Sequence, residues 1–248
     1  ALTAIEEAVQ LRRTLATQRP DAYLPDLAGS LNNLANRLSG LGRAEQALTA
    51  IEEAVQLYRT LATQRPDAYL PDLATSLNNL ANRLGGLGRA EEALTAIEEA
   101  VQLRRTLATQ RPEVYQSALG RSLQVAAANY GRLGVLAKDR GDCGEAERRY
   151  QQTLTVFEEL GDRAGTATSF SLMGELKSAW GLGGEAVVWH IRALALRAEL
   201  KVPQAAIDIR ALRGLRTELG PQTFTTHALT VLSPEVLEQL DDLLDKAA

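Results

Sequence analysis

Two clusters of asparagine are the side chains in this sequence best suited to binding a ligand. The clusters are Asn32, Asn33 and Asn36 and, in an identical stretch 46 residues later, Asn78, Asn79 and Asn82. A carboxamide offers both a donor and an acceptor, so it can bind a peptide unit of almost any sequence. Asparagine is also a poor helix former compared with alanine. The repeated clusters therefore predict either a ligand-binding surface or side chains that brace neighbouring elements.

Residues that could perform catalysis are few and isolated. His190, His227 and the single cysteine, Cys143, have no serine, thiol or carboxylate patterned to serve them. His190 falls on an apolar helical stripe, which favours a place in the core or in a groove wall. Two distant histidines and one cysteine also lack the spacing of metal ligands. We therefore expect no catalytic residue, no metal and no cofactor, and a protein that is not an enzyme.

Three Gly-Leu-Gly turns, at residues 40–42, 86–88 and 181–183, have a superficial likeness to phosphate-binding loops. A dinucleotide-binding loop follows a strand and needs Gly or Ala three residues after its second glycine. The turns here follow helical patterns, and Glu45 and Glu91 occupy that position in the first two. The glycines are therefore predicted to end helices in the left-handed conformation.

The composition excludes several classes of protein. The chain has 248 residues with a net charge of −4 and interleaved signs, which argues against binding to nucleic acid or an anionic membrane. Its apolar runs are too short to span a bilayer, and no charged-then-apolar leader begins it. The lone cysteine suits a reducing compartment, so we expect a cytoplasmic protein. Arginine greatly outnumbers lysine, which favours a bacterial origin.

The asparagine clusters belong to an internal repeat of 46 residues. Residues 1–46 and 47–92 differ at only four positions, and a third copy stays in step from 93 to 112. The differing pairs are Arg12/Tyr58, Gly29/Thr75, Ser39/Gly85 and Gln46/Glu92. Repeats of this length are stacked helical units, each unable to bury its apolar face alone.

The apolar periodicity predicts about eleven helices and no sheet. In the first unit the expected helices are 1–18, 25–40 and 44–64, with 21–24 as a connector. Later helices are expected at 113–140, 143–160, 163–180, 184–200 and 203–219, with a last one starting near Ser233. The predicted organisation is 46-residue units over 1–138, shorter 40-residue units over 139–220 and capping helices over 221–248.

Position-specific residues identify the kind of repeat. Tyr130-x2-Leu133-Gly134-x2-Ala137, followed by Gly141 and Ala146-x3-Tyr150, resembles the tetratricopeptide (TPR) signature. The Leu-Asn-Asn-Leu-Ala and Gly-Arg-x-Glu-Glu-Ala phrases resemble the long-unit subtype typified by kinesin light chain, and are similar to TPR arrays of bacterial signalling proteins. The resemblance implies an all-α, right-handed superhelical solenoid of antiparallel helix pairs.

The resemblance also implies a function. In that family the first helix of each unit lines a concave groove that holds a peptide or protein segment, and asparagines bond the ligand backbone. The residues carried over are Asn32, Asn33, Asn36, Asn78, Asn79 and Asn82, with Arg132 and Glu175 as variant positions that set specificity. The leading expectation is a non-enzymatic binding scaffold. The alternatives are a structural spacer or self-assembling rod, and a sensor or regulatory repeat region of a larger signalling protein.

The two ends of the sequence differ in character. The chain begins within a unit, so Leu2, Ile5, Ala8 and Val9 are expected to lack their usual cover. The last predicted helix instead places Asp241, Asp242 and Asp245 on its outer side. We therefore expect at most a weak homodimer, formed through the N-terminal end.

Overall fold

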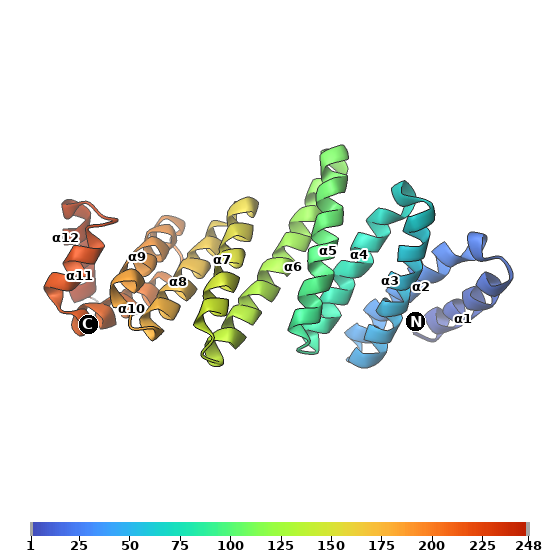
Figure 1. Ribbon diagram of the computed structural model, residues 1–248, viewed down its shortest axis with the longest axis horizontal. Helices are drawn as coiled ribbons and strands as arrows, with labels where there is room; N and C mark the ends of the chain where they lie inside the picture. Colours follow the sequence, from blue (N-terminus) through green and yellow to red (C-terminus); the bar gives the residue numbers. More distant parts are fainter. Residues whose placement is uncertain (1, 247–248) are drawn as a thin grey trace. The chain divides into compact units, whose positions relative to one another are not determined.

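The computed structural model describes residues 2–246, and within that range the chain is helical with no strand (Figure 1). The helices are α1 (Leu2–Gln18), α2 (Pro20–Gly40), α3 (Ala44–Gln64), α4 (Pro66–Gly86), α5 (Ala90–Gln110), α6 (Pro112–Asp139), α7 (Cys143–Leu160), α8 (Arg163–Ala179), α9 (Gly183–Leu200), α10 (Ala205–Leu219), α11 (Pro221–Ala228) and α12 (Pro234–Lys246). The predicted all-α fold is confirmed. The described residues form twelve helices rather than eleven, because a separate short helix begins at Pro221.

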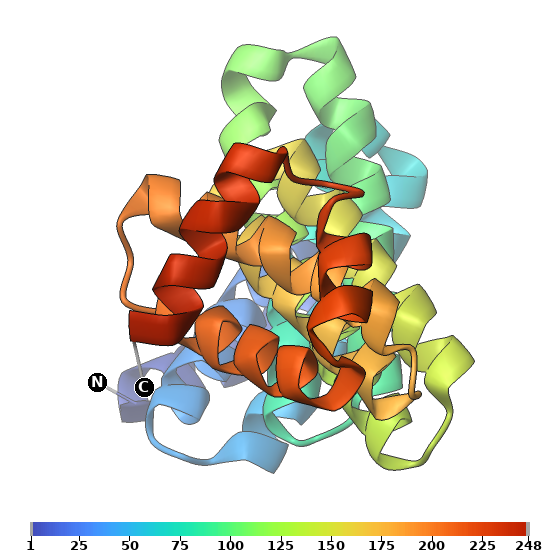
Figure 2. The same ribbon diagram turned by 90° about the vertical axis from the view of Figure 1, so that its left-hand side faces the viewer.

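The chain divides into two compact units, residues 1–129 and 130–248, so the division falls within α6. In the first unit each of α1 to α4 packs on the next helix along the chain, and α2 also contacts α4. Val9 of α1, expected from the sequence to lack cover, is 2% exposed. In the second unit α7 packs on α8, α8 on α9 and α9 on α10, while α11 and α12 complete the end of this unit (Figure 2). The links between neighbouring helices are short, as is usual for antiparallel helix pairs.

Small residues allow the helices to pack closely in the first unit. Ala35, Ala47 and Ala54 are each fully buried, and their small side chains let neighbouring helices approach closely. Leu31 and Ile51 fill the space around them and are also buried. The apolar arc of each helix therefore faces its neighbours, as its periodicity predicts.

The expected connector at 21–24 is wrong. The second helix begins at Pro20, whose missing N–H is not needed at a helix start, and Pro25 lies inside it. Pro25 leaves the carbonyl of Asp21 without a helical partner, but Asp21 is exposed and water can satisfy it. A single residue, Arg19, therefore separates α1 from α2, with φ −141° and ψ 77°. Arg65 forms the same junction between α3 and α4.

The Gly-Leu-Gly turns cap helices, as predicted. Gly42 and Gly88 have φ values of 75° and 77°, and each follows the end of a first helix. A side chain there would be strained, so glycine ends the helix at little cost. The turn then leads directly into α3 or α5, which keeps the repeat compact.

The last helices form a separate apolar core around Leu212, Phe224 and Leu244, all of which are buried. Asp241 and Asp245 of α12 both form ion pairs with Arg216 of α10, so these two carboxylates lie at the side of α12 next to α10, and the prediction that they lie on its outer side is wrong. Val236 and Leu243 of α12 are exposed.

Candidate functional site

Carboxamide side chains join the first two asparagine-bearing helices. Asn79 Nδ2 of α4 donates to Asn32 Oδ1 of α2 at 2.9 Å. Arg83 Nη2 of α4 donates to Asn36 Oδ1 of α2 at 3.0 Å, and Arg83 also donates to the hydroxyl of Ser39. These contacts recur along the helices at intervals of about one turn, so they fix how α2 and α4 pack.

The same bracing continues from α4 to α6. Asn78 Oδ1 accepts a hydrogen bond from Ser122 Oγ at 2.8 Å and a longer one from Arg104 Nη1 at 3.5 Å. The bracing alternative for the asparagines is therefore confirmed at Asn32, Asn78 and Asn79, each half-buried between helices.

The remaining asparagines are open. Asn33 and Asn82 are exposed and make no hydrogen bond with other residues in the described part of the chain. Asn36 is exposed too, and only its carbonyl oxygen is engaged. Asn36 and Asn82 occupy the same position on successive first helices, one repeat apart. These side chains are the ones that a ligand can reach.

These contacts between first helices, namely Asn32–Asn79, Asn36–Arg83 and Asn78–Ser122, form what we call the asparagine ladder. A buried arginine that the sequence analysis does not single out lies beside it. Arg104 is 6% exposed, and it donates to the hydroxyl of Ser122, to the carbonyl of Ala118 at 2.8 Å and to Thr75 Oγ1 at 3.3 Å. All its partners are neutral, so burial, with a smaller effect of the nearby Arg121 charge, lowers the pKa of Arg104 to about 10.

The equivalent residue in the second copy is Tyr58, also buried. Burial, followed by the charge of Asp72, raises the pKa of the Tyr58 hydroxyl to about 12. The sequence does mark this position, because Arg12/Tyr58 is one of the four positions at which the first two copies differ.

Arg132 and Glu175 lie in the second unit. Arg132 is exposed, and Glu175, also exposed, forms an ion pair with Lys138 at 3.7 Å between the oxygen Oε2 and Nζ. Both residues belong to the second unit, whereas the asparagine contacts belong to the first.

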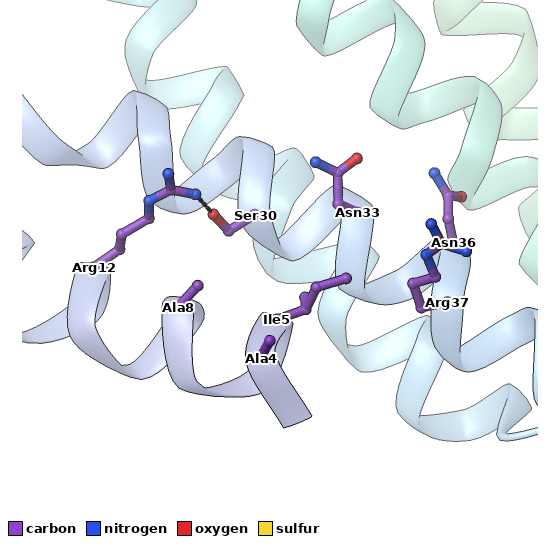
Figure 3. A pocket seen from close by; sticks show the side chains of 8 residues that line it. All are labelled: Ala4, Ile5, Ala8, Arg12, Ser30, Asn33, Asn36 and Arg37. Carbon is purple, nitrogen blue, oxygen red and sulfur yellow. Dashed lines mark hydrogen bonds between the residues drawn. The ribbon is translucent and has the colours of Figure 1, made fainter. Parts of the chain in front are cut away.

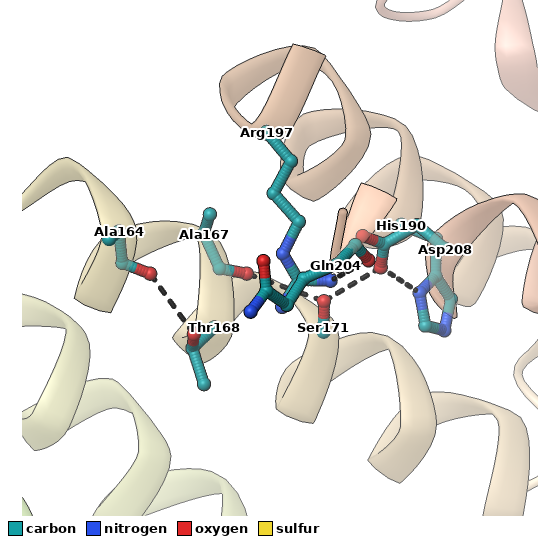
Figure 4. A network of polar contacts seen from close by, with 8 residues as sticks. All are labelled: Ala164, Ala167, Thr168, Ser171, His190, Arg197, Gln204 and Asp208. Atoms are coloured by element: carbon teal, nitrogen blue, oxygen red, sulfur yellow. Dashed lines mark hydrogen bonds and ion pairs between the residues drawn. The ribbon is translucent and has the colours of Figure 1, made fainter. Parts of the chain in front are cut away.

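A polar network is buried in the second unit (Figure 4). Asp208, which is 0% exposed, accepts hydrogen bonds from Ser171 Oγ at 2.7 Å and pairs with His190 Nδ1 at 2.9 Å. Arg197 forms an ion pair with its other carboxylate oxygen. The residue types are those of a serine hydrolase, but Ser171 contacts the carboxylate rather than the imidazole. The network is closed to solvent and joins α8, α9 and α10, so it stabilises packing, and the predicted core position of His190 is confirmed.

No other cluster offers chemistry. Cys143 is half-buried at the start of α7, and the described residues contain no group of three or more His, Cys, Asp or Glu arranged to hold a metal. None of the helices in residues 2–246 combines the length and apolar character needed to cross a membrane. The ladder and its open asparagines are therefore the candidate site.

Comparisons with known proteins agree with this geometry. Models of the tetratricopeptide repeat match residues 27–62 and 73–108, and residues 124–199. A comparison with curated protein sequences finds no match.

Among solved structures, BtubC (BKLC) from P. vanneervenii has 21% identity and a TM-score of 0.51, covering 98% of this chain and 91% of that chain. A putative kinesin light chain with nearly identical TPR-like repeats from Podosopora anserina has 19% identity and a TM-score of 0.46, covering 88% and 95%. MamA has 16% identity and a TM-score of 0.44, covering 79% and 91%. At this identity the likeness to BtubC concerns the fold alone.

Proposed function

Because the chain belongs to the tetratricopeptide repeat family, we propose that it is a non-enzymatic scaffold that binds a protein or peptide segment along the first helices of its repeats. The proposed site in the first unit consists of the open carboxamides of α2 and α4. The observation that carries the proposal is that Asn82 is exposed and makes no hydrogen bond within the described residues. An interior helical asparagine with no partner disfavours its helix, so a role in binding accounts for it.

In this proposal some asparagines hold the helices together and others bind the ligand. Asn32, Asn78 and Asn79 hold the first helices together, and this packing sets the spacing of Asn36 and Asn82. Arg83 fixes the carbonyl oxygen of Asn36, which leaves its amide nitrogen to donate to a ligand. A peptide backbone needs both donors and acceptors, and the two asparagines supply both.

The second unit carries charged positions of its own. Arg132 and the Lys138–Glu175 pair are charged, and in this proposal they recognise the side chains of a segment bound to that unit. The proposal keeps the repeat boundaries predicted from the sequence. These are 46-residue units over 1–138, 40-residue units over 139–220 and capping helices over 221–248.

The test is selection of short peptides from a random display library against the wild-type chain. The selected peptides are then measured against the Asn36→Ala/Asn82→Ala variant, whose affinity should fall because each lost net hydrogen bond is worth about 0.5–1.5 kcal/mol. Gln102→Ala, an exposed substitution on α5, is the matched control and should bind normally. Unchanged affinity in the double variant would exclude the asparagines from the site.

A further inference from the structure

A stripe of exposed polar side chains runs along the first helices of the first unit. On α2 it holds Asp26, Asn33 and Asn36, and both asparagines project from the helix (Figure 3). On α4 it holds Asp72 and Asn82, which are the counterparts of Asp26 and Asn36 one repeat later. At about 100° per residue these positions fall within an arc of about 80°, so they form one face of each helix. The open asparagines of the proposed site therefore share this face with two aspartates.

The hydroxyl of Tyr58 lies beside the two aspartates of this stripe. Tyr58 is 7% exposed, and its hydroxyl oxygen is 3.5 Å from the point where a Cβ on Gly29 would stand, so no side chain of α2 covers it at that position. Burial raises the pKa of this hydroxyl to about 12, and the charges of Asp72 and Asp26 contribute to the rise. A buried hydroxyl and two carboxylates therefore meet on this part of the stripe.

None of these three groups has a partner among residues 2–246. The hydroxyl of Tyr58 makes no hydrogen bond there, and neither Asp26 nor Asp72 forms an ion pair. Burial raises the pKa of Asp72, so this carboxylate is partly removed from water. An ammonium or guanidinium group has donors for all three groups and would neutralise the carboxylates. We call these three residues the acidic subsite, and it suits a basic side chain.

Two arginines on the next pair of helices form a basic subsite. Arg104 of α5 is 6% exposed and bonds only to neutral groups, among them Thr75. Arg121 of α6 is exposed, and its hydrogen bond within residues 2–246 is to the hydroxyl of Ser117 at 3.0 Å. The charge of Arg121, after the larger effect of burial, lowers the pKa of Arg104, so the two guanidinium groups are close. The described chain supplies no carboxylate to either, so an anionic group would stabilise both charges.

The order of the two subsites sets the charge pattern of a matching ligand. Tyr58 and Arg104 occupy the same position on successive second helices. Packed helices lie about 8–10 Å apart, so the next second helix is roughly 10–20 Å away. An extended peptide covers that distance with about three to six residues. A segment with charges of only one sign would fit one subsite and be repelled by the other.

We propose that the first unit binds an extended peptide segment that carries a basic side chain and, about three to six residues away, an acidic one. The basic side chain binds at the acidic subsite, and the acidic side chain binds at the basic subsite. This inference rests on the proposed function, because Asn36 and Asn82 hold the backbone of the same segment.

The test uses peptides enriched from a random display library on the full chain, which should share one basic and one acidic residue in a constant order. Replacing the acidic residue of such a peptide by its amide should weaken binding to the wild-type chain about three- to tenfold. With Arg121→Gln the same replacement should change binding by less than about twofold, because the partner charge is gone. Arg105→Gln, an exposed change of the same charge on α5, is the matched control and should keep the wild-type response.

The acidic subsite is tested in the same way. Replacing the basic residue of the peptide by methionine should weaken binding to the wild-type chain about three- to tenfold and should have little effect with Asp72→Asn. Asp67→Asn, an exposed change of the same charge in the first turn of α4, is the matched control. Thermal unfolding of each variant verifies that it is folded.

Enriched peptides without the two charges would overturn the inference, as would losses with Arg121→Gln and Asp72→Asn equal to those with the wild-type chain. The proposed function would survive these outcomes if Asn36→Ala/Asn82→Ala still weakened binding. Coupling of the charges with no effect of that asparagine variant would support the two subsites and exclude the asparagines. A library that yields no binder would contradict both proposals.

Discussion

The hydroxyl oxygen of Tyr58 lies 3.5 Å from the point where a Cβ on Gly29 would stand. One repeat further on, the same two positions hold Arg104 and Thr75, which share a hydrogen bond of 3.3 Å. Two of the four differences between the copies therefore form a contacting pair. Where the second helix carries tyrosine its partner is glycine, and where it carries arginine its partner is threonine.

This pairing predicts energetic coupling. Tyr58→Arg is expected to lower the free energy of unfolding by about 1–3 kcal/mol, because it buries a guanidinium with no hydroxyl facing it from position 29. Adding Gly29→Thr should recover about 0.5–1.5 kcal/mol through the new hydrogen bond. Gly29→Val on the same background is the control, and urea unfolding is the measurement. Equal recovery by valine and threonine would mean that the hydrogen bond contributes nothing.

The asparagine ladder gives a matched pair of substitutions. Asn79→Ala removes the bond to Asn32 and should lower the free energy of unfolding by about 0.5–1 kcal/mol, since the better helix propensity of alanine offsets part of the loss. Asn82→Ala removes no hydrogen bond within the described residues, so stability should stay the same or rise slightly. Urea or thermal unfolding of the two variants checks this. A larger loss for Asn82→Ala would reverse the assignment of bracing and open positions.

The buried network around Asp208 predicts that different substitutions within it lower the free energy of unfolding by different amounts. Asp208→Ala leaves Arg197 buried without its counter-charge, and the expected loss is about 3–5 kcal/mol. Ser171→Ala removes one hydrogen bond to the same carboxylate and should cost about 1 kcal/mol. Chemical denaturation of each variant gives the comparison. Similar losses for both would show that the Asp208–Arg197 ion pair is not the main source of stability there.

The raised pKa of Tyr58 predicts a loss of stability at high pH. In the folded chain this hydroxyl stays protonated up to about pH 12, whereas in the unfolded chain it ionises near pH 10. Between these values the unfolded state binds fewer protons, so the free energy of unfolding falls as pH rises, by at most about 1.4 kcal/mol per pH unit.

Tyr58→Phe should remove this contribution, so the variant should lose less stability than the wild type between about pH 10 and pH 12. The comparison uses urea midpoints at each pH, with Tyr69→Phe as the control. A wild-type profile in the Tyr58→Phe variant would contradict the assignment.

The periodicity of single helices was sufficient to predict most of the fold. It placed α3 and α7 at their observed bounds, because an apolar stripe and the glycines or proline that flank it fix where such a helix begins and ends. It placed the start of α2 too late, because Pro25 lies inside the helix instead of starting it. The helix tolerates Pro25 because the carbonyl of Asp21 that it frees is exposed, and exposure depends on the fold rather than on the pattern within one helix.

The candidate site was harder to predict than the fold. The sequence singles out Asn32 and Asn36 through their repeated clusters, but a cluster in one helix contains no neighbouring helix, so it could not show that Asn32 bonds to Asn79. Asp208 had no pattern of its own, because its partners Ser171 and His190 come from helices distant in sequence. Contacts between helices, rather than positions along one helix, decide which polar groups are available.

The single-residue junctions between helices have a consequence for proteolysis. Arg19, Arg65 and Arg111 are exposed where the backbone leaves the helix, so a trypsin-like enzyme can reach these basic residues. Each is followed by proline, whose ring removes the N–H and fixes the backbone on the far side of the bond to be cut. These three exposed basic sites are thereby protected, and we expect digestion instead at the glycine turns, after Arg43 and Arg89.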